Sequence, residues 1–165
     1  MTSLRATVAG AVALILAGAI WHPQARAEAR PGAPAPVFEA RNVAGKTVRL
    51  NDFAGKTVVL EWTNADCPFV KKHYESGNIP KLQADAMAKG VVWLQVISSA
   101  PGQQGYVDGA TARKLNDYRG AKPSGTVLDP DGTIGKLYGA QTTPHIFIID
   151  AGNFLQGIPG DRLRL

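Results

Sequence analysis

Three short apolar runs constrain the fold of this chain more than any other feature of its sequence. They are TVVLEW (57–62), VVWLQVISS (91–99) and PHIFIID (144–150), and all three are rich in β-branched residues. Runs that are apolar at nearly every position are typical of strands buried on both faces of a sheet. The segments between them carry helix signals, and strands that alternate with helices indicate an α/β domain. The sequence therefore predicts the α/β class, with a central mixed sheet flanked by helices.

The clearest helix signals follow the first run. Pro68 suits the first position of a helix, where a missing N–H is not needed. Gly77 and Asn78 interrupt this helix, Pro80 can restart it, and Gly90 is a natural stop. Shorter helices are expected over DGATARKLNDYRG and TIGKLYG, with a short strand GTVL between them. The segments VFEARNV and TVRL predict an N-terminal β-hairpin, and AGNFLQG predicts a turn into a last strand.

The first 27 residues have the pattern of a secretory signal peptide. Arg5 precedes an uncharged apolar run, and ARA at 25–27 has the small-x-small form of a cleavage site. An uncleaved membrane anchor is the alternative, although the run is shorter than the about 20 residues of a spanning helix. We expect a signal peptide over 1–27, an Ala- and Pro-rich lead-in over 28–36 and one domain over 37–165. The mature protein would then be periplasmic or otherwise exported.

Charge and composition argue against several function classes. The formal net charge is +5, and removal of Arg5 and Arg26 with the signal peptide would leave +3. That charge is mild, and no basic run interleaved with aromatic residues indicates a nucleic-acid partner. No later stretch is long and apolar enough to span a membrane, so no membrane contact is expected after cleavage. DPDG (129–132) lacks the later ligands of a calcium loop and predicts a turn, and no motif indicates an organic cofactor.

Cys67 is the only cysteine of the chain and the main candidate for chemistry. It precedes Pro68 and so falls at the N-cap of the predicted helix. Free backbone N–H groups and the positive end of the helix dipole favour a thiolate there, and Lys71, Lys72 and His73 add positive charge. A single cysteine forms no internal disulfide, so it is inert and buried, reactive, or half of an intermolecular pair. The position of Cys67 favours a reactive thiol.

The segment APAPVFEARNVAGKTVRLNDFAGKTVVLEWTNADCPF resembles the opening of the redoxin branch of the thioredoxin superfamily. That branch includes peroxiredoxins of the alkyl hydroperoxide reductase and thiol-specific antioxidant type, and exported thiol–disulfide oxidoreductases. QTTPHIFIIDAGN resembles the second hallmark of the branch. The resemblance covers residues 34–157 and implies a thioredoxin-like fold with a cis bond before Pro144. It also implies that Thr143 offers its backbone to a partner segment opposite Cys67.

Three departures from the family pattern bear on function. The family's oxidoreductases carry Cys-x-x-Cys, whereas the fourth position here is Val70. Peroxiredoxins have a threonine three residues before their cysteine, where this chain has Asn64. They also hold an arginine over the thiolate, for which Arg113 and Arg119 are the candidates. After the third apolar run the family closes with a strand and a helix, and this chain ends with what reads as a shortened C-terminus.

Two further sets of residues have more than one interpretation. Glu61 is a charged residue in an apolar strand, and it either takes the thiol proton from beneath Cys67 or faces water at the end of the strand. His73 and His145 could join Cys67 in a soft-metal site for copper(I) or zinc. The alternative is that His145 is an ordinary strand histidine.

The sequence thus predicts an exported thiol oxidoreductase with one reactive cysteine, and it predicts no cofactor. The expected partners are protein or low-molecular-weight thiols and disulfides, or a peroxide in an antioxidant reaction, with an external thiol that resolves the intermediate. The alternative is a non-catalytic binding protein that uses the same cleft for a metal or a partner peptide. The catalytic residue is Cys67, and the residues expected to support it are Glu61, Pro68, Lys71, Thr143 and Pro144.

Overall fold

The structure is a computed structural model, and it describes residues 29–157. Within them the strands form one seven-stranded mixed sheet in the order β2-β1-β5-β4-β3-β6-β7. The strands are β1 (Glu39–Asn42), β2 (Thr47–Arg49), β3 (Val58–Trp62), β4 (Val92–Ile97), β5 (Gly125–Leu128), β6 (His145–Ile149) and β7 (Leu155–Gly157). β3, β4 and β5 run parallel, and the remaining pairs are antiparallel. The predicted α/β class, central mixed sheet and N-terminal hairpin are confirmed.

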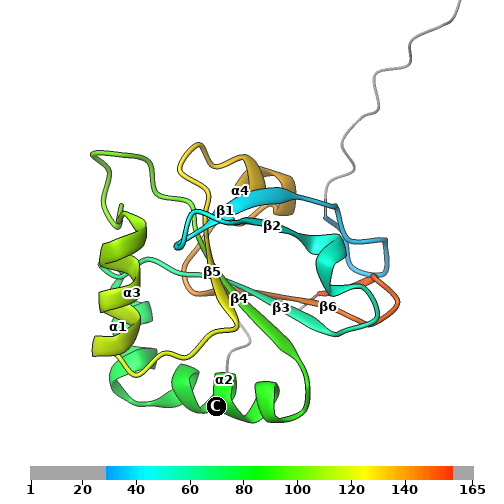
Figure 1. Cartoon of the computed structure of the whole chain (residues 1–165), viewed down its shortest axis with the longest axis horizontal. Helices are drawn as coiled ribbons and strands as arrows, with labels where there is room; N and C mark the ends of the chain where they lie inside the picture. Colours follow the sequence, from blue (N-terminus) through cyan, green and yellow to red (C-terminus); the bar gives the residue numbers. More distant parts are fainter. Residues whose placement is uncertain (1–28, 158–165) are drawn as a thin grey trace, which may run out of the picture.

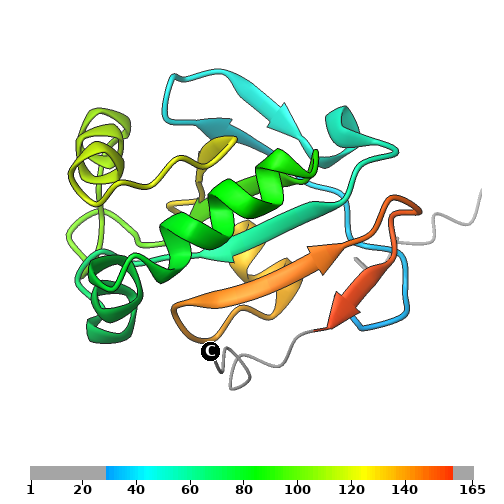
Figure 2. The same cartoon turned by 90° about the horizontal axis from the view of Figure 1, so that it is seen from below.

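The helices lie on both sides of this sheet (Figures 1 and 2). They are α1 (Pro68–Glu75), α2 (Asn78–Ala88), α3 (Gly109–Tyr118), α4 (Thr133–Tyr138) and the short 3-10 helix η1 (Leu50–Phe53). α1 and α2 cover one side, and α2 crosses over the sheet in Figure 2. α4 packs against the other side (Figure 1).

Because side chains alternate along a strand, each central strand contributes to two separate layers of core. We call the layer under α4 the α4 face; it includes Leu60, Trp62 and Phe147. We call the layer under α1 and α2 the α1 face; it includes Val59 and Trp93. The dense apolar pattern of β3 follows directly from burial on both faces.

The helix that begins at Pro68 is interrupted as the sequence predicts. Gly77 has φ of 72°, in the left-handed region that glycine adopts without strain, and it separates α1 from α2. α2 begins at Asn78 rather than at Pro80. Pro80 falls in its first turn, where backbone N–H groups have no intrahelical partner, so the proline is tolerated two residues inside the helix.

The lead-in packs against the body of the domain. Gly32 donates its N–H to the carbonyl oxygen of Leu155 at 2.8 Å, and Ala35 donates to that of Asn153 at 2.8 Å. The Ala35 side chain is buried in the α4 face. These contacts tie the lead-in to the turn before β7.

Two expectations lie outside the described residues. They are the signal peptide over 1–27 and the shortened C-terminus beyond residue 157. Within residues 29–157, no helix has the length and apolar character that a membrane crossing requires.

Candidate active site around Cys67

Cys67 lies at the end of the loop that connects β3 to α1. It is the N-cap residue of α1, with extended backbone angles of φ −69° and ψ 125°, and Pro68 is the first helical residue. Its carbonyl oxygen accepts from the N–H of Lys71 at 3.0 Å, which begins the helical hydrogen-bond ladder. The side chain is half-buried and packs against the α1 face. The predicted helix N-terminus is confirmed, and the Cys67 side chain is partly exposed there.

The loop before β6 meets this sulfur. The Cys67 thiol donates to the carbonyl oxygen of Thr143 at an Sγ–O distance of 3.1 Å. The Thr143–Pro144 peptide bond is cis, as predicted, and Pro144 is buried. β6 then pairs with β3, so that His145 lies opposite Trp62. Two segments 76 residues apart in the sequence are thereby brought together at the thiol.

The surroundings of Cys67 lower the pKa of its thiol. Burial favours the neutral form and raises the pKa, but hydrogen bonds with the Thr143 side chain and with the backbone of Val70 and Phe69 outweigh it. The groups that lower the pKa are thus the N–H groups at the helix N-terminus and the Thr143 side chain, whereas the Thr143 carbonyl oxygen, which accepts from the thiol, favours the neutral form. Lys71, which the sequence predicts to contribute to this effect, is exposed on α1.

A tight loop between β3 and Cys67 sets the position of the thiol. The Asn64 side-chain oxygen accepts from the N–H of Asp66 at 2.8 Å, and the carbonyl oxygen of Asn64 accepts from the N–H of Cys67 at 3.1 Å. Gly105 donates its N–H to the Asp66 carboxylate at 3.0 Å. The Asn64 side chain lies directly where a Cβ on Gly105 would be. Asn64 therefore stabilises the loop through hydrogen bonds inside it, and Gly105 stabilises it through a hydrogen bond from a separate segment.

Glu61 is wholly buried in the α1 face, so the alternative in which it faces water is wrong. Its carboxylate accepts from the Tyr74 hydroxyl at 2.6 Å, from Trp93 Nε1 at 2.7 Å and from Gln83 Nε2 at 3.1 Å. Burial raises the pKa of Glu61, and these three donors and the charge of Arg119 only partly offset it. A carboxylate with a raised pKa under the helix that carries the thiol is suited to proton exchange.

Comparison with known proteins agrees with this geometry. The AhpC/TSA family model matches residues 31–158, which is most of the chain. This chain belongs to the AhpC/TSA family. The resemblance found in the sequence is therefore confirmed. A comparison with curated proteins found no match.

Solved structures place this AhpC/TSA member among thioredoxin-like folds. An uncharacterized conserved protein from Geobacillus kaustophilus is 27% identical with a TM-score of 0.69, over 82% of this chain and 78% of its own. The exposed lipoprotein thioredoxin Etrx1 from Streptococcus pneumoniae is 26% identical with a TM-score of 0.56, over 74% of this chain and 90% of its own. A putative thiol:disulfide interchange protein DsbE from Chlorobium tepidum shares the fold at 24% identity and a TM-score of 0.64, over 82% and 92%.

The structure shows where the residues that depart from the AhpC/TSA pattern lie. Val70 is 1% exposed and sits inside the α1 face one turn after Cys67. The two candidate arginines have other partners in the structure. Arg113 donates to the carbonyl oxygen of Val43, and the Arg119 guanidinium lies over the Tyr74 ring at 3.9 Å from its centroid.

The two histidines do not join Cys67. His145 stacks on Phe147 with ring centroids 4.3 Å apart, so its ring belongs to the α4 face, whereas Cys67 packs on the α1 face. The His73 ring pairs with the Asn78 amide at 3.0 Å. Among residues 29–157 no group of three or more His, Cys, Asp or Glu side chains could hold a metal ion. The soft-metal alternative therefore lacks its ligand set in this part of the chain.

A groove of about 280 Å³ is lined in part by Thr143, whose carbonyl oxygen accepts from the Cys67 thiol. The other side chains that line it come from the ends of β3 and β4 and from the loop before β6, and none of them is charged; they are Trp62, Thr63, Asn64, Ser98, Ser99, Ala140, Gln141 and Thr142. Hydroxyl and amide groups prevail, so the groove offers hydrogen bonds to an uncharged polar segment such as peptide backbone.

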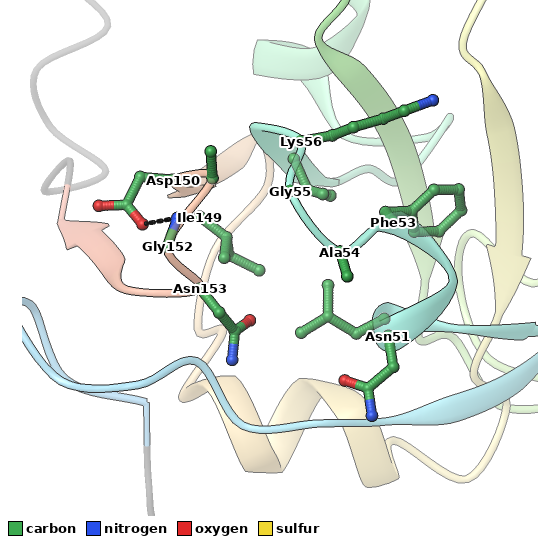
Figure 3. A pocket seen from close by; sticks show the side chains of 12 residues that line it. Asn51, Phe53, Ala54, Gly55, Lys56, Ile149, Asp150, Gly152 and Asn153 are labelled. Atoms are coloured by element: carbon green, nitrogen blue, oxygen red, sulfur yellow. Dashed lines mark hydrogen bonds between the residues drawn. The ribbon is translucent and has the colours of Figure 1, made fainter.

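A second cavity, of about 250 Å³, lies at the other end of β3 and β6 (Figure 3). Val58 at the start of β3 and Ile149 at the end of β6 line it, whereas Cys67 follows the end of β3. The Asp150 carboxylate at its rim accepts from the N–H of Gly152 at 2.9 Å and so closes the turn before β7. This cavity is therefore remote from the thiol.

Sequence reasoning missed the partners of Glu61. Tyr74, Gln83 and Trp93 come from α1, α2 and β4, so no local pattern joins them to β3. One signal was present in the apolar run 91–99. Gln95 interrupts that run, and a polar residue in a strand buried on both faces needs a buried partner.

Proposed function

We propose that this AhpC/TSA member is an exported thiol–disulfide oxidoreductase that uses Cys67 as its only redox-active thiol. One observation carries the proposal. The Cys67 sulfur lies at a helix N-terminus, half-exposed, with a lowered pKa and 3.1 Å from the carbonyl oxygen of Thr143 next to cis Pro144. A polypeptide that runs along Thr143 would present its own sulfur to the thiolate.

The reaction needs no cofactor, because thiolate attack supplies the chemistry. The Cys67 thiolate attacks one sulfur of a partner disulfide, forms a mixed disulfide and releases the other sulfur as a thiolate. An external thiolate then attacks the partner's sulfur in the mixed disulfide, forms a new disulfide with the partner and releases Cys67. Glu61 exchanges the proton of the Cys67 thiol in this cycle.

Val70 supports the need for an external thiol. In a Cys-x-x-Cys protein the fourth position would release the trapped partner, but here it is an apolar side chain in the core. Peroxide reduction is the weaker alternative, because Arg113 and Arg119 are held by Val43 and Tyr74. The signal-peptide pattern of residues 1–27 supports an exported location, which N-terminal sequencing of the protein from the cell envelope would test by a start near Glu28.

The test compares the protein with its Cys67→Ser variant. The wild type should exchange with a small-molecule disulfide near neutral pH and give a mass-spectrometric adduct at Cys67, and the variant should give neither. Hydrogen peroxide in place of the disulfide separates the two chemistries. Full exchange by the Cys67→Ser variant would contradict the proposal and leave a peptide-binding role for the groove.

Val70→Cys is the complementary gain of function. It would create a Cys-x-x-Cys pair at the start of α1 and allow internal release of the partner, so insulin reduction with a reductant present should rise well above the wild-type rate. Val70→Ala is the matched control, because it also shortens the buried side chain but supplies no thiol. Equal rates for Val70→Cys and Val70→Ala would argue against a site competent for disulfide exchange.

A further inference from the structure

The buried carboxylate of Glu61 is the last acceptor in a chain of hydrogen bonds that crosses the α1 face. Tyr74 donates to Glu61 at 2.6 Å and accepts from Gln95 Nε2 at 2.7 Å. The Gln95 oxygen in turn accepts from the Thr126 hydroxyl at 2.9 Å. The chain thus passes from β3 to α1, β4 and β5.

The other end of the chain is a cation. The Thr126 oxygen accepts from Asn116 Nδ2 at 3.0 Å, and the Asn116 oxygen accepts from Arg119 Nη2 at 2.8 Å. Asn116 belongs to α3, and Arg119 caps the same helix at its C-terminus. The side chains between the two ends, Tyr74, Gln95, Thr126 and Asn116, are all buried.

Arg119 sets the direction of every bond in this chain. A guanidinium has donors and no acceptor, so the Asn116 oxygen must face it and the Asn116 amide nitrogen must face Thr126. The Thr126 hydroxyl accepts from Asn116 and donates its proton to the Gln95 oxygen. By the same logic the Gln95 nitrogen faces Tyr74, and the Tyr74 proton points at Glu61.

We propose that Arg119 is a positioning residue for Glu61, because its guanidinium orients the chain so that Glu61 is held in the acceptor-only, carboxylate form. The reversed chain would suit the protonated form. In that arrangement the Glu61 proton is donated to the Tyr74 oxygen, and the Tyr74 proton to a turned Gln95. The reversed chain requires either that the Asn116 nitrogen face Arg119, which offers it no acceptor, or that the buried Thr126 hydroxyl accept from both amides and leave its own proton without a partner.

The guanidinium itself is held in place. It stacks on the Tyr74 ring at 3.9 Å, and with Thr63 it lines a cavity of about 10 Å³, the size of one water molecule. Among the described residues, Tyr74 and Arg119 are the ionisable groups that act on Glu61. The remaining groups that face Glu61 from α2, β4 and β6 do not titrate; they are Gln83, Trp93, Gln95 and Ile146.

This inference deepens the proposed function, since it explains how a fully buried carboxyl stays available as a proton acceptor. It predicts that the protonation of Glu61 responds to changes at Thr126 and Asn116, which are separated from it by intervening side chains. A purely through-space effect of the Arg119 charge would leave those positions without influence. The two explanations therefore differ in a measurable way.

The experiment is a pH titration of the Glu61 carboxyl carbon by NMR in protein with labelled glutamate, with the signal assigned through Glu61→Gln. Arg119→Gln and Thr126→Val should each raise the proton affinity of Glu61 at least about tenfold, which corresponds to one pKa unit. Arg119→Lys is donor-only and Thr126→Ser keeps the hydroxyl, so both should stay close to wild type. Asn116→Ala cuts the chain one link further away and should behave like Thr126→Val.

An unchanged Glu61 titration in folded Thr126→Val and Asn116→Ala would overturn the proposal, even if Arg119→Gln shifts it, because charge alone would then be sufficient. Circular dichroism establishes that each variant is folded. Because Thr126→Val and Asn116→Ala interrupt the chain of hydrogen bonds at different places, the test remains decisive if one of these variants unfolds. The titration does not depend on turnover. If the Glu61 titration shifts as expected but the pH profile of disulfide exchange does not shift with it, the proposed role of Arg119 is supported and the proposed base role of Glu61 is contradicted.

Discussion

Leu60 and Glu61 are neighbours on β3 and both are wholly buried, yet they enter opposite environments. Leu60 points into the α4 face, where Trp62, Phe147 and Tyr138 pack with ring centroids 5.2 to 5.6 Å apart. Glu61 points into the α1 face, among the donors that hold its carboxylate. Around β3 the sheet therefore separates a layer of aromatic and aliphatic packing from a layer that carries a buried polar network under α1.

This difference between the two faces shows where the fold buries polar atoms. A buried carboxyl without partners would be strongly destabilising, so the α1 face needs a donor for each oxygen. The α4 face meets the same requirement partly with backbone groups. The buried Tyr138 donates to the carbonyl oxygen of Pro36 at 2.7 Å, and the buried Asp129 carboxylate accepts from the N–H groups of Ile134 and Gly135 at 3.0 and 2.9 Å. Substitutions on the two faces should consequently affect different properties.

The largest effect is expected on stability, from Leu60→Ala on the α4 face. Truncation of a fully buried leucine removes packing and leaves a cavity, at a cost of about 3 kcal/mol in the free energy of unfolding. Urea denaturation measures this cost, and Leu60→Met, which conserves volume, should cost less than about 1.5 kcal/mol. The pH profile of Cys67 alkylation should stay unchanged in folded Leu60→Ala, and a displaced profile would mean that the two faces are not independent.

The next effect is expected on reactivity, from Glu61→Gln on the α1 face. Loss of a positioned proton acceptor should slow disulfide exchange about 10²-fold near neutral pH. The exchange rate with a small-molecule disulfide checks this, and Glu75→Gln, at an exposed carboxylate on α1, is the matched control. Equal rates in the two variants would assign Glu61 to structure alone.

A smaller effect is expected from Gly105→Ala, because Gly105 supports the loop before Cys67. Its φ of 79° is unfavourable for alanine by about 1 kcal/mol, and the added Cβ would displace the Asn64 side chain. Misplacement of the thiol should lower the exchange rate about tenfold. Gly102→Ala separates the two causes, since Gly102 has φ of 80° but open space around it. A similar loss of rate in both variants would point to backbone strain instead of the Asn64 contact.

Local patterns predicted the fold well, because they depend on neighbours in the chain. The apolar run 57–62 predicted β3, and Pro68 predicted the start of α1 with Cys67 at its N-cap. The cis bond at Pro144 followed from the family resemblance, because an X–Pro bond is cis only about one time in twenty. What placed the thiol correctly was thus a combination of helix chemistry and resemblance.

The environment of the site could not be read in the same way. The sequence does not decide whether Glu61 is buried, because a charge in an apolar strand suits either a strand end or a buried partner. The partners are side chains such as Tyr74 and Trp93 on separate elements, and only packing brings them together. Proximity in sequence suggests Lys71 as a support for the thiolate, but hydrogen bonds from the Thr143 side chain and the helix backbone favour the thiolate there.

The smallest expected effect comes from the titratable ring on the α4 face. Burial lowers the pKa of His145, so the folded protein holds this ring neutral while the unfolded chain takes up a proton below about pH 6.5. Stability should therefore fall as the pH drops through 6.5 towards the lower folded-state pKa, by less than about 1 kcal/mol because solvent reaches the half-buried ring. Urea denaturation at pH 5 and 8 measures the change. His145→Gln should reduce the pH dependence and His73→Gln should retain it, and the opposite pattern would mean that the titrating ring lies on α1.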